Sequence, residues 1–173
     1  MALINTTTTG VLGSTFYGDG TGDLTVQQNG VTVNKITSAP AFFASISSAQ
    51  SLSTASYTKM QMGTEVFDTN NNYDSTTNYR FTPTVAGYYL VTISLFWTST
   101  VVSPSNAIYK NGSIYSSRYD QGSYTNLMQG HTALIYLNGT TDYIENFAQI
   151  SSGTTAVYTG NNSSFQAFLA RAA

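Results

Sequence analysis

Few side chains in this sequence could carry out chemistry. His131 is the only histidine and there is no cysteine, so thiolate chemistry, disulfides and zinc sites built on several histidines are excluded. A dyad of His131 with Ser123 or Asp120 is conceivable, but no motif places a nucleophile beside the imidazole. We therefore expect no catalytic residues and no cofactor. His131 is expected on a strand or at an interface, where its protonation could alter a contact.

Asp19, Gly20, Gly22 and Asp23 are the residues that come nearest to a metal site. Carboxylate and backbone oxygens are the ligands that calcium prefers. The spacing matches no loop with a complete ligand set, and a glycine-rich turn explains the same residues. We expect a turn there and no metal.

A further group of candidate residues is aromatic. The chain holds 13 tyrosines and 9 phenylalanines, and Tyr115, Tyr119, Asp120 and Tyr124 lie within one short stretch. Aromatic rings that stack on sugars, flanked by carboxylates, form glycan sites. Alternatively, tyrosine takes the place of charged side chains as surface cover and interface filler. These four residues are the predicted contact for a glycan or a protein partner.

The scarcity of charge excludes several classes of partner. Charged residues make up 8% of the 173 residues, where soluble domains carry about 25%. With a net charge of −2, no basic surface is expected for nucleic acid or for an acidic membrane. The most apolar run, residues 86–97, is shorter than the roughly 20 residues that span a bilayer, so membrane insertion is not expected. Residues 1–10 lack the basic and apolar regions of a secretion signal.

The apolar run 86–97 has the periodicity of a strand. Every second residue is apolar, whereas the residues between them are mixed, which is typical of a strand with one fully buried face. Many of its residues are β-branched or aromatic, and Pro83 and Gly87 mark its entry. The residues predicted to point inward are Tyr89, Val91, Ile93, Leu95 and Trp97.

Three Asn-Gly dipeptides predict turns between the other strands, because Asn and Gly tolerate the positive φ of a two-residue hairpin. The first would join strands at 24–28 and 31–35 and place Val26 opposite Val33. With no amphipathic helix in the pattern, the fold class is all-β: a sandwich, barrel or jelly roll. The other predicted strands are 107–110 paired with 113–116, 132–137 paired with 140–147, and a last strand over 164–171.

The chain divides into two parts by composition. Residues 1–38 are rich in Thr and Gly and hold one hairpin, while residues 39–173 have the pattern of one compact unit. The first part has too few apolar residues for its own core, and an isolated hairpin is marginal in water. We expect it to pack on another surface as an attachment segment. Its candidate docking residues are Leu24, Val26, Val31 and Val33.

Four blocks of the second part carry a resemblance to a known family. Segment 39–45 contains the pattern Ala-Phe-x-Ala, segment 108–113 is a short hairpin, and segment 163–172 closes the chain with Phe165, Phe168 and Leu169. Together with a central block, they resemble, in the same order, the C1q/TNF-like jelly roll, the globular head of the complement C1q family. The central block matches through Phe67, Asn72, Tyr73, Asp74, Phe81, Pro83, Gly87, Tyr88 and Tyr89.

The resemblance implies a ten-strand C1q/TNF-like jelly-roll sandwich, here with a short N-terminal β-hairpin extension, that trimerises around a threefold axis through an aromatic-lined interface. It also implies a binding or assembly module without catalytic activity, since the family binds proteins, glycans or lipids. Two departures stand out: Ala167 replaces a glycine of the closing strand, and Tyr136 and Thr140 replace the second Leu and the Asp of the family's Leu-x-Leu-x-x-Gly-Asp turn.

Low charge, the absence of cysteine and the Thr/Gly-rich first part are similar to the C1q-like knobs of bacteriophage virion proteins. We therefore expect a non-enzymatic homotrimer on the virion surface, assembled in the host cytoplasm, that serves as a capsid decoration (cement) protein or head-fibre knob. Its expected partners are the major capsid protein or another virion protein, and a host surface glycan. Two alternatives stay open: the glycan-binding, receptor-binding tip of a phage tail fibre, and a secreted cellular C1q-like adhesin.

Overall fold

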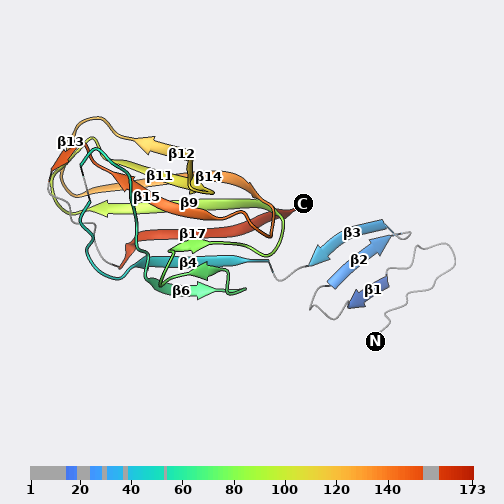
Figure 1. Cartoon of the computed structure of the whole chain (residues 1–173). Coiled ribbons are helices and arrows are strands. Elements are labelled where there is room, and N and C mark those ends of the chain that lie inside the picture. The colour runs from blue at the N-terminus through green and yellow to red at the C-terminus, as the bar shows by residue number, and fades with distance from the viewer. Residues whose placement is uncertain (1–14, 19–23, 29–30, 37–38, 53, 154–159) are drawn as a thin grey trace. The chain divides into compact units, whose positions relative to one another are not determined.

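The computed structural model describes residues 15–18, 24–28, 31–36, 39–52, 54–153 and 160–173. The chain forms two compact units, Met1–Ala39 and Pro40–Ala173 (Figure 1). All regular structure in the described residues is β. None of these residues belongs to a helix that is long and apolar enough to cross a membrane.

The first unit is an antiparallel three-stranded sheet in the order β1-β2-β3. The sequence predicted the hairpin of β2 and β3, and the structure adds β1 beside β2. The predicted pairing of Val26 with Val33 is wrong, because a β-bulge after Val26 places an extra residue in β3, and Val26 pairs with Asn34 instead. The strands are β1 (Thr15–Gly18), β2 (Leu24–Gln28) and β3 (Val31–Ile36).

The candidate docking residues lie on these strands, Leu24 and Val26 on β2 and Val31 and Val33 on β3. The candidate calcium residues fall within segment 19–23, which lies outside the described residues.

The second unit is a sandwich of two antiparallel sheets (Figure 1). The first sheet has the order β14-β9-β17-β4-β6. The first sheet has five strands, and the second has a path of five strands with a sixth beside it, which agrees with the two-sheet jelly-roll sandwich that the resemblance implied. The strands of the first sheet are β4 (Ala41–Ile46), β6 (Thr64–Asp68), β9 (Gly87–Trp97), β14 (Leu127–Leu137) and β17 (Gly160–Ala172).

The second sheet has the order β12-β11-β15-β8-β7, with β5 beside β15. A small third sheet, β13-β10-β16, lies at the end of the sandwich opposite the C-terminus, where Figure 1 labels β13. The strands of the second sheet are β5 (Thr58–Lys59), β7 (Tyr73–Asp74), β8 (Arg80–Phe81), β11 (Ser105–Lys110), β12 (Ser113–Tyr119) and β15 (Ile144–Gln149). Those of the third are β10 (Val101–Val102), β13 (Ser123–Tyr124) and β16 (Ser152–Gly153).

Strand β9 lies between β14 and β17 in the first sheet and supplies much of the core. Across the core, Phe42 of β4 stacks on Tyr73 and Phe81 of the second sheet, with 4.6 Å between the ring centroids in each pair. The predicted alternation of β9 is confirmed, because the following five residues are all 0% exposed: Tyr89, Val91, Ile93, Leu95 and Trp97.

The second predicted hairpin is confirmed as β11 and β12. Its turn residues, Asn111 and Gly112, have φ values of 53° and 78°, as a tight turn of this kind requires. The predicted last strand is present as the longer β17.

The third predicted hairpin is wrong. Strand β14 pairs with β9 and strand β15 pairs with β11, so the segment between them crosses from one sheet to the other. The side-chain oxygen of Asn138 accepts N–H groups from Thr140, Thr141 and Asp142. Gly139 has a φ of 72°. The Asn-Gly pair therefore forms a turn, as predicted, but the strand after it joins the other sheet.

Candidate binding surfaces

The first sheet has an outer face, formed by the side chains of β14, β9, β17, β4 and β6 that point away from the core. Strand register aligns these side chains in rows across the sheet. One row crosses four strands in the order Leu134, Leu90, Phe168 and Ala41. An entirely apolar row on the side of a sheet away from the core indicates a surface that another molecule covers.

Aromatic pairs lie on either side of this row. Tyr88 of β9 and Tyr136 of β14 meet edge to face, with ring centroids 5.5 Å apart. Toward the other edge of the sheet, Phe43 of β4 stacks on Phe67 of β6 at 6.4 Å. The outer face thus carries apolar groups on every one of its five strands.

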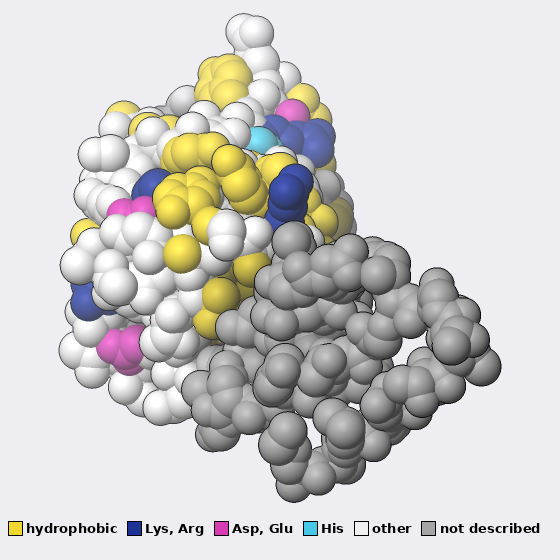
Figure 2. Space-filling model, turned by 90° about the vertical axis from the view of Figure 1, so that its right-hand side faces the viewer, with side chains coloured by type: hydrophobic (Ala, Val, Ile, Leu, Met, Phe, Trp, Pro, Cys, Tyr) yellow, Lys and Arg dark blue, Asp and Glu magenta, His cyan; other side chains and the backbone are white. Residues whose placement is uncertain are grey.

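Exposed apolar side chains are concentrated on the outer face. Leu134 is 54% exposed and Phe168 is 49% exposed. Figure 2 shows hydrophobic side chains gathered on the end of the second unit from which the C-terminus emerges. The outer face holds six of the ten exposed large hydrophobic side chains of the described residues: Phe67, Tyr88, Met128, Leu134, Tyr136 and Phe168.

A hollow of about 310 Å³ lies in the outer face, lined by Tyr88, Leu134, Ala170 and Arg171. Strand β17 has a β-bulge at this point, between Leu169 and Arg171. A hollow beside exposed apolar side chains is suited to receive an apolar side chain from another molecule.

The free edge of β14 is closed by side chains from the second sheet. Arg118 Nη1 donates to the carbonyl of Gly130 at 3.1 Å, and Tyr115 Oη donates to the carbonyl of Leu134 at 3.2 Å. Carbonyl groups that are already paired cannot accept a further strand. Association through the first sheet is therefore favoured at its outer face and not at this edge.

His131 lies in the same seam between β14 and β12, as the strand prediction required. Its Nε2 atom is 2.9 Å from Ser116 Oγ. Burial lowers the pKa of His131 below its ordinary 6.5, and the positive charge of Arg118 lowers it further. The hydrogen bonds of the described residues place neither Ser123 nor Asp120 on the ring, so the conceivable dyads do not form.

The four residues predicted to contact a glycan or partner lie on and around β12 and β13. Tyr115 donates to a β14 carbonyl, Tyr124 donates to a carbonyl of its own loop at 2.7 Å, and Asp120 pairs with Arg118. Tyr119, by contrast, is 58% exposed. Because the polar atoms of the other three are already engaged, Tyr119 is the most open of the group. Their role as contacts stays a prediction.

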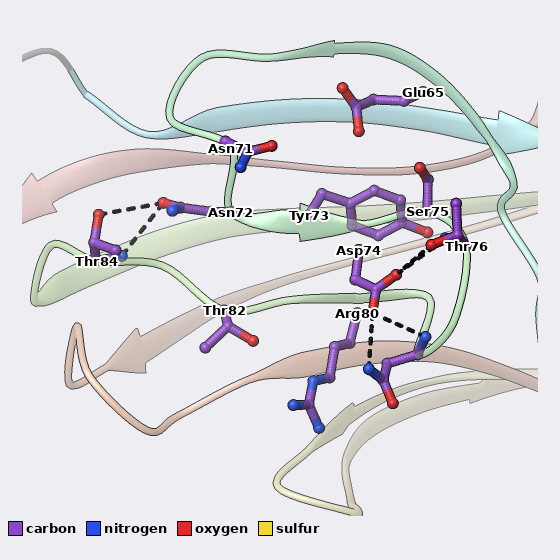
Figure 3. A pocket seen from close by; sticks show the side chains of 11 residues that line it. Glu65, Asn71, Asn72, Tyr73, Asp74, Ser75, Thr76, Arg80, Thr82 and Thr84 are labelled. Atoms are coloured by element: carbon purple, nitrogen blue, oxygen red, sulfur yellow. Dashed lines mark hydrogen bonds between the residues drawn. The ribbon is translucent and has the colours of Figure 1, made fainter.

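A polar cavity of about 560 Å³, which the sequence did not predict as a site, lies beside β6, β7 and β8 (Figure 3). The sequence signal for it is the run Thr-Asn-Asn-Asn-Tyr-Asp at 69–74, which is dense in residues that cap turns. The lining residues are Glu65, Asn71, Asn72, Tyr73, Asp74, Ser75, Thr76, Asn78, Arg80, Thr82 and Thr84.

The wall of the polar cavity is held by Asx turns. The Asp74 carboxylate accepts N–H groups from Thr77 at 2.8 Å, Thr76 at 3.0 Å and Asn78 at 3.1 Å. These hydrogen bonds hold the pKa of Asp74 well below its ordinary value. Asn72 Oδ1 accepts the N–H of Thr84 at 3.3 Å, as the dashed lines of Figure 3 show.

Metal binding has little support in the described part of the chain. No group of three or more His, Cys, Asp or Glu side chains there could hold an ion. Within the polar cavity, the oxygens of Asp74 are already occupied by the donors of its own turn.

No protein-family model and no curated protein matches the sequence. Among solved structures, the globular domain of zebrafish complement 1qA protein matches with a TM-score of 0.59 and 15% identity, over 78% of this chain and 99% of that one. Murine APRIL matches with a TM-score of 0.56 and 10% identity, over 75% of this chain and 97% of that one. These likenesses establish the fold: the chain is a C1q/TNF-like jelly roll.

The vertex protein P5 of PRD1 matches with a TM-score of 0.48 and 15% identity, over 94% of this chain and 83% of that one. A TM-score at this level does not establish a shared fold. The expectation of a virion role therefore rests on the composition and organisation of the chain itself.

Proposed function

We propose that the chain is a non-enzymatic structural protein of a virion surface, a decoration (cement) protein or head-fibre knob. Three copies assemble through the outer face, the jelly roll is displayed, and residues 1–38 attach the trimer to the major capsid protein or another virion protein. The exposed apolar outer face is the observation that carries this proposal.

Self-association explains why the outer face is apolar. Removing apolar surface from water is worth roughly 25 cal/mol per Å², and six large side chains on one face present much of it. Monomeric proteins rarely expose a contiguous patch of this kind. A second copy of the chain offers a matching apolar surface, and the C1q/TNF-like fold makes three copies the expected number.

The separate first unit supports the attachment role. In the order β1-β2-β3, the outer strands β1 and β3 each have one neighbour among the described strands. A strand with a free edge can pair with a strand of another protein through backbone hydrogen bonds. Three such units in a trimer multiply a weak contact through their effective concentration.

The attachment role predicts the behaviour of a truncated chain that begins at Pro40. Because the second unit has its own core, this chain should fold and assemble as the full chain does. It should fail to co-sediment with particles that lack the protein, whereas the full chain should bind them. If the truncated chain binds particles as well as the full chain does, docking lies in the jelly roll and the attachment role is wrong.

A second candidate function is the glycan-binding tip of a phage tail fibre, and the polar cavity favours it. The position of the protein on the particle separates the two functions. A cryo-electron microscopy map with density for the trimer on the capsid supports decoration, whereas density only at the tail tip supports receptor binding.

A further inference from the structure

The polar cavity combines a rigid frame with polar side chains that have no partner. The side chains of Glu65, Asn71, Ser75 and Thr82 all line it. None of the four makes a hydrogen bond or ion pair to the residues that the structure describes. These groups are free to bind a ligand, and they span both donors and acceptors.

The frame that carries these groups is held independently of any ligand. Tyr73 N–H donates to Asp68 Oδ2 at 2.6 Å, and its ring is buried in the core stack with Phe42. Thr82 N–H donates to the carbonyl of Asn72 at 2.8 Å. A site whose backbone is already fixed loses little conformational entropy when a ligand binds.

The charges of the polar cavity argue against an ionic ligand. Figure 3 shows Glu65 and Arg80 on opposite sides of the Asp74 turn. The Arg80 guanidinium lies over the ring of Tyr143, 4.6 Å from its centroid. An anion would meet one cation and the carboxylate of Glu65. A cation would find only Glu65 free, because Asp74 is saturated by its own turn.

The lining also argues against an apolar ligand, since hydroxyl, amide and charged groups dominate it. A ligand that suits it should carry no net charge, must both donate and accept hydrogen bonds, and must fit a volume of about 560 Å³. Pockets for small molecules have volumes of about 300–1,000 Å³. Neutral saccharide residues meet all of these conditions.

We propose that the polar cavity is a binding site for neutral saccharide units, in which Glu65 and Thr82 hold hydroxyl groups from two sides. Glu65 accepts from sugar hydroxyls, while Thr82 both donates and accepts. The site belongs to a single copy of the chain, so it depends neither on the proposed trimer nor on the virion role. It also differs from the tyrosine-rich stretch that the sequence favoured.

The test uses the full chain and a panel of free sugars: glucose, galactose, mannose, rhamnose and N-acetylglucosamine. Saturation-transfer NMR should show saturable binding of at least one of them, in the millimolar range typical of weak ligands. Inorganic phosphate and calcium chloride should not compete with that sugar. The proposal is overturned if no sugar of the panel binds, or if phosphate or calcium displaces it.

Variants locate the site. Thr82→Val and Glu65→Gln should each weaken binding by about threefold to tenfold, as the loss of one hydrogen bond predicts. Thr77→Val is the matched control, because Thr77 is exposed and its side chain does not line the cavity. Circular dichroism and the melting temperature show whether Thr82→Val still folds. If it does not, the test of the site rests on Glu65→Gln, because Glu65 is exposed and its substitution should not disturb the fold. Affinity unchanged in Glu65→Gln, or reduced equally in Thr77→Val, would contradict the assignment.

Discussion

At the scale of residues, neighbouring side chains of β9 should contribute very differently to the free energy of unfolding, because they alternate between the core and the outer face. Ile93 is fully buried between the two sheets, whereas its neighbour Thr92 lies on the outer face and bonds Thr132 Oγ1 at 3.0 Å. Ile93→Ala should lower the free energy of unfolding by about 2–5 kcal/mol, because it removes buried methyl groups and leaves a cavity. Urea denaturation measures this.

Thr92→Ala is the control on the opposite face of the same strand. It removes one partly exposed hydrogen bond, so it should cost about 0.5–1.5 kcal/mol at most. A larger loss of stability for Thr92→Ala than for Ile93→Ala would mean that the inward and outward faces of β9 are reversed.

His131 should make stability depend on pH. Its pKa is lower in the folded protein than the ordinary 6.5, so the unfolded chain binds a proton first. Stability should therefore be fully present above pH 6.5 and fall as the pH drops from 6.5 toward the lowered pKa. Melting temperatures measured between pH 7 and pH 5 give the slope.

The matched variant for this prediction is His131→Gln, which keeps a polar group near Ser116 but does not titrate. Its melting temperature should change less over the same pH range. Asp74 and Asp142, whose pKa values are also lowered, lose their contribution only below their ordinary 3.8, so they do not interfere. If the melting temperature falls equally with pH in both proteins, groups other than His131 control the stability between pH 7 and pH 5.

Predictions about individual residues were correct where the sequence pattern that supports them lies within one short segment. The alternation of apolar residues from Tyr89 to Trp97 predicts which side chains point into the core, and the structure confirms it. The polar cavity was missed because Glu65 and Thr82 are 17 positions apart and ordinary by type. The hydrogen bond of Tyr115 to the carbonyl of Leu134 also could not be predicted, because it depends on how β12 packs beside β14.

At the scale of elements, the loop from Asn138 to Tyr143 decides how the two sheets connect. Gly139 has a φ of 72°, and a Cβ atom built there would clash with the backbone nitrogen of Ala86. Gly139→Ala should therefore destabilise the protein by more than the roughly 1 kcal/mol that a positive φ alone costs a side chain. Chemical denaturation measures the loss.

Gly112→Ala is the matched control for that loop. Gly112 also has a positive φ, of 78°, but a Cβ atom there would meet only Tyr143 Oη, at an ordinary 3.6 Å. This substitution should cost less than Gly139→Ala. Equal losses would indicate that the close approach to Ala86 contributes nothing.

The same loop shows why strands were easier to predict than their pairing. Asn138 and Gly139 form a turn, as their types indicate. The strand with which β15 then pairs is β11, whose paired residues lie 34 to 44 positions earlier in the chain, and no local pattern carries that information. The β2–β3 register was predicted wrongly for a related reason, because a single bulge between Val26 and Gln27 shifts every pair that lies farther from the turn.

At the scale of the whole molecule, the proposed assembly depends on what covers the outer face. Its apolar row became visible only when register placed Leu134 beside Leu90 and Leu90 beside Phe168, since the three come from distant parts of the sequence. Leu134→Arg would put a charge into this row. We expect it to break the assembly without unfolding the protomer, because Leu134 lies outside the core.

The mass of the full chain in solution, measured by multi-angle light scattering at micromolar concentration, is the direct test of assembly through the outer face. Assembly of three copies predicts a mass of three times the 18.6 kDa of one chain for the natural sequence. For Leu134→Arg it predicts the mass of a single folded chain, or a mean mass between those of one chain and three chains if the trimer still forms weakly. A stable monomer of the natural sequence, or a trimer that Leu134→Arg leaves intact, would contradict assembly through the outer face.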